Sequence, residues 1–152
     1  MNRIIHDSVR LQCDIRRAFE MFTVNEHIQS WLAPLADVEA VEGGKYELFW
    51  DPDDRESNST IGCRVTAIES GKFLSFEWKG PEQFRHFMNN AEPLTHVVVF
   101  LIPCTEGSTP CTEVHVIHSG WGISAEWEEA RLWFERAWSN AFEQLRKQVN
   151  RE

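Results

Sequence analysis

The side chains with the clearest chemical potential in this sequence are its aromatic rings. Seven tryptophans and ten phenylalanines stand among 152 residues. Large flat rings suit two different uses, because they either fill a hydrophobic core densely or form the walls of a pocket for a flat apolar molecule. Composition leaves both uses open, so the position of each ring along the predicted elements has to decide between them.

One carboxylate and two histidines are the candidates for acid–base chemistry. Asp7 shares its side of the alternating segment 4–13 with Ile5, which places it on the inner face of a predicted strand. His96 and His118 come near one another if the segments around them pair as a hairpin. Two imidazoles can ligate a metal, but no third ligand and no pairing of a nucleophile with a base is evident. The sequence therefore predicts no metal, no cofactor and no catalytic site.

The four cysteines do not form a metal-binding pattern. Cys13, Cys63, Cys104 and Cys111 are widely spaced and include no CxxC pair, which argues against a zinc site. Cys104 and Cys111 flank a predicted hairpin loop and could face one another across two strands. We expect separate thiols, because a cytoplasmic protein is kept in a reducing environment.

The longest predicted element is a helix over residues 124–149. Ser124 is a good N-cap, acidic residues follow in the first turn, and Arg146 and Lys147 stand in the last turn, where they complement the helix dipole. The apolar residues with helical spacing are Trp127, Ala130, Phe134, Ala137, Trp138, Ala141, Leu145 and Val149. A rod of about 39 Å needs a large apolar partner. We expect a cavity, if there is one, at the aromatic first half up to Trp138, and plain packing beyond it.

The elements before this helix are predicted to be one strand, two short helices and a run of strands. Asp14 caps the first short helix, and Thr23 with Glu26 forms a capping box for the second. Residues 36–119 consist of alternating segments joined by short turns, which predicts an antiparallel sheet with Trp78 on its inner face.

Two segments of this sheet region remain ambiguous. Residues 80–94 interrupt the alternation with three large apolar side chains, as expected either for a packed connector or for a mobile lid over a cavity. Residues 95–103 are apolar at both odd and even positions, so both faces of this strand are apolar. The strand is therefore either covered on both sides or part of a surface through which two copies of the chain contact one another.

Composition and charge limit the class of protein. Hydrophobic residues at 42% and charged residues at 26% are ordinary for one globular domain, here residues 1–152. A net charge of −9 without clustered Lys and Arg argues against nucleic acid and against an anionic membrane surface as partners. No apolar run reaches the roughly 18 residues of a membrane-spanning helix, and no signal peptide is evident, so we expect a cytoplasmic protein.

The order of elements resembles a known architecture. The segments that carry the resemblance are AFEMFTVNEHIQSWLAP, GGKYELFW, GCRVTAIESGKFLSFEWKGP, THVVVFLIP and HSGWGISAEWEEARLWFERAWSNAFEQL. They resemble the START/Bet v-like (SRPBCC) superfamily, and more closely the small single-domain homologues of the activator of heat-shock protein 90 ATPase. The resemblance implies an α+β helix-grip fold, in which a curved antiparallel sheet wraps around the long C-terminal helix. One departure is Cys111-Thr112 before the last strand, where the family commonly shows Gly-Thr.

The resemblance also implies that the space between sheet and helix can be a cavity for a small hydrophobic or aromatic ligand. The candidate wall residues are Trp31, Trp50, Trp78, His96, Trp121, Trp127 and Phe134, with Phe84 and Phe87 near the mouth. The alternative is that these rings simply fill the space, because a void of ligand size is costly.

Two other functions stay open. By family analogy the chain is a chaperone partner, although nothing in it corresponds to the separate N-terminal domain through which the eukaryotic activators make part of their contact. Alternatively, as for some superfamily relatives, it is a cyclase- or hydrolase-like enzyme, for which Asp7, His96 and His118 are the best inward candidates. The resemblance brings no agreed catalytic or metal motif, so binding is favoured over catalysis.

Overall fold

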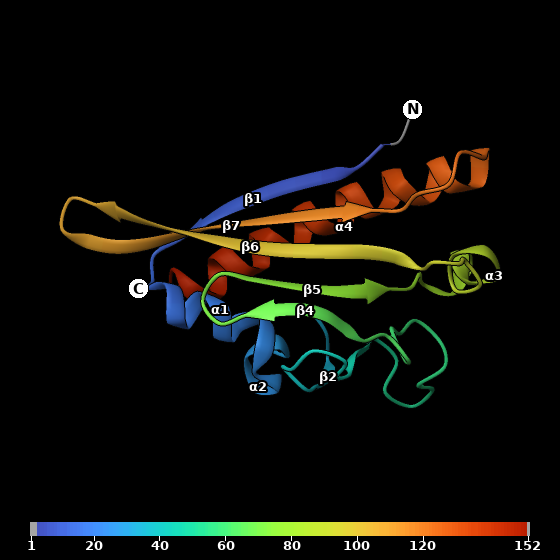
Figure 1. Ribbon diagram of the computed structural model, residues 1–152, viewed down its shortest axis with the longest axis horizontal. Coiled ribbons are helices and arrows are strands. Elements are labelled where there is room, and N and C mark those ends of the chain that lie inside the picture. The colour runs from blue at the N-terminus through green and yellow to red at the C-terminus, as the bar shows by residue number, and fades with distance from the viewer. Residues whose placement is uncertain (1–2, 152) are drawn as a thin grey trace.

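The computed structural model describes residues 3–151 and shows an α+β architecture. The elements are β1 (Ile5–Leu11), α1 (Ile15–Thr23), α2 (Asn25–Ile28), β2 (Leu35–Val38), β3 (Tyr46–Phe49), β4 (Val65–Glu69), β5 (Phe73–Trp78), a 3-10 helix η1 (Glu82–Phe84), α3 (Arg85–Met88), β6 (Thr95–Glu106), β7 (Thr109–Ser119) and α4 (Ala125–Val149). Helix α4 runs along one face of the large sheet, and α1 and α2 lie together at one end of it (Figure 1). The predicted helix-grip fold is confirmed.

The strands form two sheets rather than one uninterrupted meander. Five antiparallel strands lie in the order β1-β7-β6-β5-β4, while β2 and β3 form a separate two-stranded sheet. An isolated bridge between Lys45 and Arg64 joins the residue just before β3 to the residue just before β4. Strand β5 pairs with β6 so that Trp78 lies opposite Thr95, and Trp78 points into the core, as predicted.

Helix α4 begins and ends where the sequence predicts. The Ser124 hydroxyl accepts a hydrogen bond from the Trp127 amide at 3.3 Å, and the 25-residue helix ends at Val149. Its buried face is wider than the predicted stripe, because it includes Phe142 and Arg131. Arg131 is only 7% exposed, and its guanidinium forms ion pairs with two glutamates of its own helix. The aliphatic part of an arginine side chain can be buried in this way while its guanidinium stays ion-paired.

The two short helices after β1 are present, but only one predicted cap is correct. Asp14 accepts from the Arg17 amide at 2.9 Å, which caps α1. The capping box predicted for α2 is wrong, because the N-cap position is Val24 and carries no side-chain hydrogen bond. Thr23 is instead the last residue of α1, and its hydroxyl donates to the Phe19 carbonyl at 3.1 Å.

The cysteine expectation is wrong for one pair. The hairpin register places Cys104 directly opposite Cys111, with their Cα atoms 4.9 Å apart, and the two form a disulfide. The expectation rested on the cellular compartment, whereas the strand register brings these side chains together. Cys13 and Cys63 are separate buried thiols, and burial raises the pKa of Cys13 to about 11 and that of Cys63 to about 12.

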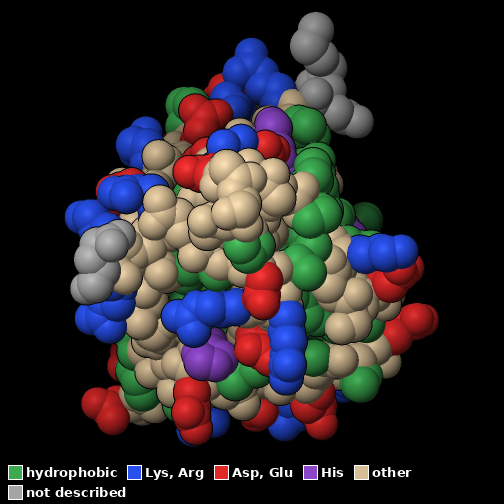
Figure 2. Space-filling view, turned by 90° about the vertical axis from the view of Figure 1, so that its left-hand side faces the viewer, with side chains coloured by type: hydrophobic (Ala, Val, Ile, Leu, Met, Phe, Trp, Pro, Cys, Tyr) green, Lys and Arg blue, Asp and Glu red, His purple; other side chains and the backbone are tan. Residues whose placement is uncertain are grey.

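The surface carries both signs of charge. Figure 2 shows the end of the molecule at the left of Figure 1, towards which the β6–β7 hairpin projects, and there basic and acidic side chains are interspersed. Among residues 3–151, no helix combines the length and the apolar character that crossing a bilayer requires.

Candidate functional site

A groove of about 460 Å³ lies between the sheet and α4. Six aromatic side chains form its walls: Trp31, Trp50, Trp78, Trp133, Phe134 and Trp138. They come from the α2–β2 connection, the ends of β3 and β5, and the middle of α4. We call this space the groove. Its walls are mainly apolar, so it suits a hydrophobic ligand.

Small residues leave the groove open. Helix α4 presents Ala137 and Ala141 to it, one turn apart. Gly80, at its edge, packs closely against Met88, because a Cβ atom there would lie 2.6 Å from the methionine sulfur and would force that side chain to shift. Polar amides, among them Asn58 and Asn140, complete the lining.

Hydrogen bonds hold three of the wall indoles in place. The indole N–H of Trp31 donates to the Met21 carbonyl at 2.9 Å. That of Trp50 donates to the Leu32 carbonyl at 3.1 Å. Trp138 donates to Nδ1 of His118 at 3.1 Å. The walls are therefore fixed in orientation without any ligand.

His118 supports the groove from behind. It is fully buried and does not line the groove. Because its Nδ1 accepts from Trp138, its Nε2 carries the proton and donates to the Thr95 hydroxyl at 3.0 Å. Thr95 in turn donates to the Trp78 carbonyl at 3.3 Å. Burial lowers the pKa of His118 to about 3, so the ring is neutral near pH 7 and connects two of the wall tryptophans.

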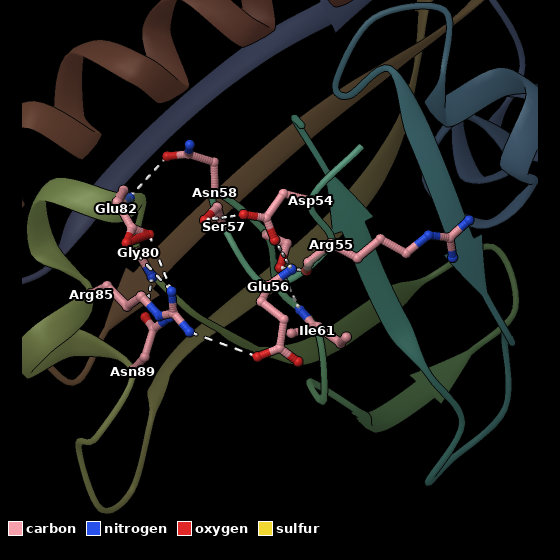
Figure 3. Close-up of polar contacts among 11 residues, drawn as sticks. Asp54, Arg55, Glu56, Ser57, Asn58, Ile61, Gly80, Glu82, Arg85 and Asn89 are labelled. Atoms are coloured by element: carbon pink, nitrogen blue, oxygen red, sulfur yellow. Dashed lines mark hydrogen bonds and ion pairs between the residues drawn. The ribbon is translucent and has the colours of Figure 1, made fainter. Parts of the chain in front are cut away.

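A polar network fixes one side of the mouth (Figure 3). The side-chain oxygen of Asn58, in the loop after β3, accepts from the Glu82 amide at 2.9 Å. Glu56 of the same loop lies 3.7 Å from the Arg85 guanidinium. These contacts join the loop to the η1–α3 segment. Since Phe84 in that segment is buried, the structure favours the packed connector over the lid.

Four of the nine predicted site residues line the groove: Trp31, Trp50, Trp78 and Phe134. Four others lie outside the groove lining and form an adjoining cluster, which we call the aromatic plug: Phe84, Phe87, Trp121 and Trp127. In the plug, the rings of Phe87 and Trp127 meet edge to face with centroids 5.0 Å apart, and those of Trp121 and Trp127 are 6.2 Å apart. The plug lies at the N-terminal end of α4 and is packed rather than hollow.

His96, the ninth residue, lies on the outer face of the sheet. The register pairs it with Glu77, which points away from the core, while its neighbours Thr95 and Val97 are buried. Its Nε2 is 2.7 Å from the Thr66 hydroxyl. Partial burial lowers the pKa of His96, and the Glu77 carboxylate opposes that shift. The prediction of an inward His96 is wrong, because Thr95, Val97 and Val99 of β6 are buried and His96, between them, faces the other side of the sheet.

The three acid–base candidates are not brought together. His96 and His118 lie on opposite faces of the sheet. Asp7, on β1, lies opposite Val116 of β7, and its carboxylate accepts from the Ser8 amide. Within residues 3–151, no group of three or more metal-ligating side chains is present.

The groove-facing side of α4 extends beyond Trp138, so the expectation of plain packing there is wrong for Ala141, which lines the groove. Trp133, Ala137, Asn140, Ala141 and Gln144 all line the groove. Their spacing, i, i+4, i+7, i+8 and i+11, marks one side of a helix. Asn140 and Gln144 are polar, so a search for apolar residues alone does not find this side of the helix.

Solved structures share this fold. A protein of Mesorhizobium loti superposes with a TM-score of 0.75 at 19% identity, covering 98% of each chain. The Aha1 dimer from Colwellia psychrerythraea gives 0.69 at 15% identity, covering 98% of this chain and 97% of that one. An HSP90 activator from Plasmodium falciparum gives 0.68 at 16% identity, with coverages of 96% and 94%. At these identities the likeness establishes the fold alone.

The sequence comparison identifies the family directly. A search of curated proteins found no match. Residues 12–150, nearly the whole chain, match the family described as activator of Hsp90 ATPase homolog 1-like protein. The chain belongs to this family.

Proposed function

We propose that this protein binds a small, flat, hydrophobic or aromatic molecule in the groove between the sheet and α4. The observation that carries the proposal is a space of about 460 Å³ with five indoles in its walls. Ligand pockets commonly have volumes of roughly 300–1,000 Å³ and mainly apolar linings with a few polar groups. The groove has both properties.

The groove also has the rigidity that favours binding. Three wall indoles are held by hydrogen bonds to the protein, and the Asn58–Glu82 contact fixes the mouth. A preformed site loses little conformational entropy when a ligand enters, so more of the contact energy appears as affinity.

A fluorescent probe tests the proposal. N-phenyl-1-naphthylamine is uncharged, and its emission rises in an apolar site. We expect saturable binding to the wild type. Ala141→Leu places extra atoms in the groove and is expected to weaken binding at least about tenfold, as steric exclusion of a bulky ligand requires.

The matched control is Ala125→Leu, which adds the same atoms at an exposed position of the same helix. It is expected to bind the probe like the wild type. Equal binding by all three proteins would contradict the proposal. Native mass spectrometry of the freshly purified protein is a second readout, since a retained small molecule should be absent from Ala141→Leu.

The second candidate function is a chaperone-partner module. It is supported by the family match and by Ile123, a large apolar side chain that is 90% exposed just before α4. The test is a titration of the labelled protein with an Hsp90-type chaperone, comparing wild type with Ile123→Ser. Unchanged NMR spectra at saturating chaperone would exclude this candidate. It also requires the cytoplasmic location that the sequence predicts, which cell fractionation tests.

A further inference from the structure

We infer that the groove selects uncharged flat molecules that carry a hydrogen-bond acceptor, and that the indole N–H of Trp78 is the donor that recognises it. This inference rests on the proposed function and narrows its ligand class. It comes from an indole N–H of the groove wall that is nearly buried and yet donates to no group in residues 3–151.

The Trp78 indole is the exception among the most buried groove tryptophans. Its side chain is only 3% exposed, yet its N–H donates to no group in residues 3–151, whereas Trp31 and Trp138 each donate to the protein. In that part of the chain every side-chain nitrogen or oxygen that is sealed from solvent has a partner. The Trp78 N–H is therefore not sealed in the core. Trp78 lines the groove, and the inference assigns its free donor to that space.

The surroundings of Trp78 disfavour a charged ligand group. Its neighbours are the rings of Trp50, Trp138, Phe76 and the neutral His118, with centroids 5.5 to 6.3 Å away. A carboxylate or ammonium placed there would lose its water without meeting an opposite charge, which is strongly unfavourable.

Lys79, the one cationic residue that residues 3–151 contribute to the lining, does not change this conclusion. Lys79 follows Trp78 at the end of β5, and its ammonium donates to the Ile61 carbonyl at 2.6 Å. The nitrogen lies beside Gly62, because a Cβ atom on that glycine would be 3.3 Å from it. A neutral acceptor, such as a carbonyl or ether oxygen or a pyridine-type ring nitrogen, therefore fits the Trp78 donor best.

Naphthalene and quinoline are the matched probes, because they differ only by one ring nitrogen in place of a C–H group. In mildly alkaline buffer quinoline is uncharged. We expect quinoline to move the Trp78 indole proton downfield in the ¹H–¹⁵N spectrum of the wild type, as a new hydrogen bond does, and naphthalene not to do so. This readout needs no substitution that could disturb folding. A quinoline spectrum in which that signal stays in place would overturn the inference.

The substitution Trp78→Phe keeps an aromatic wall and removes the donor. It should weaken quinoline about tenfold relative to naphthalene, the loss expected when a buried acceptor is left unpaired. Trp133→Phe is the control, because it removes another groove indole N–H and should leave the quinoline-to-naphthalene ratio unchanged. If the ratio changed in Trp133→Phe alone, the donor would be Trp133 and the assignment to Trp78 would be wrong.

A third probe separates this inference from the proposed function. 2-Naphthoate is expected to bind at least about tenfold more weakly than quinoline, because its charge is not compensated near Trp78. Tighter binding of naphthoate would overturn the selection for neutral molecules and leave groove binding intact. Failure of naphthalene and quinoline alike to bind would overturn the proposed function as well.

Discussion

The aromatic plug and the groove are built from the same kinds of side chain and both include residues of α4, yet one is closed and the other open. In the plug, rings pack against rings, as where Phe87 and Trp121 both meet Trp127. In the groove, the rings face Ala137 and Ala141 of α4. The difference shows that small residues opposite the rings, rather than the rings themselves, create a binding space in this fold.

The largest expected effect is on the free energy of unfolding, which should fall more when a plug ring is removed than when a groove ring is removed. Trp121→Ala removes a buried plug ring that also donates to the His118 carbonyl at 3.0 Å, and it should cost about 3–5 kcal/mol of unfolding free energy. Trp50→Ala acts on a groove ring that is 39% exposed, and it should cost about 1–2 kcal/mol, since less burial is lost. Urea denaturation measures both. Equal losses would remove the distinction between plug and groove.

The same substitution at two positions of α4 tests the role of the small residues. Ala130 is fully buried in the filled core, so Ala130→Leu should overpack it and cost about 1–3 kcal/mol. Ala141 faces the groove, so Ala141→Leu should change stability by less than about 1 kcal/mol, because the added atoms enter open space. Thermal and urea unfolding measure the pair. A large loss at Ala141 would show that the groove is not free to accept them.

A pH dependence is expected from His118, which connects the two regions. Its folded-state pKa is lowered to about 3 by burial, and a histidine in the unfolded chain has a pKa of about 6.5. Between these values the unfolded state binds more protons, so stability falls as the pH drops below about 6.5 and should be roughly 2 kcal/mol lower near pH 5 from this group alone. Denaturation midpoints across this range measure the slope.

His118→Gln should reduce that slope, whereas His86→Gln, at an exposed position, should leave it as it is. The comparison of slopes is informative even if His118→Gln is less stable at every pH. An unaltered slope in His118→Gln would mean that the lowered pKa has no part in acid sensitivity.

The sequence predicts the framework well because that framework depends on local periodicity. The cap at Ser124 and the alternation that places Trp78 inward are both visible in the chain. His96 was misplaced because residues 95–103 are apolar on both parities, so a one-residue shift of the strand is not visible in the pattern. The Cys104–Cys111 pairing depended on strand register, which outweighed an argument from the cellular compartment.

The groove was harder to predict for a different reason. Whether an aromatic side chain fills space or borders it depends on what stands opposite, and that partner is distant in sequence. Trp31 and Trp127 are indistinguishable as sequence signals, but Trp31 borders the groove with Ala137 and Ala141 in its lining, whereas Trp127 meets Phe87.

The most direct test of groove binding is a set of intermolecular NOEs between naphthalene and the methyl groups of the wild-type protein. Contacts are expected with the methyls of Ala137 and Ala141, which line the groove. Val98 and Ile117, on the outer face of the sheet, should show none. Contacts only with that outer face, or no contacts at saturating naphthalene, would contradict the account.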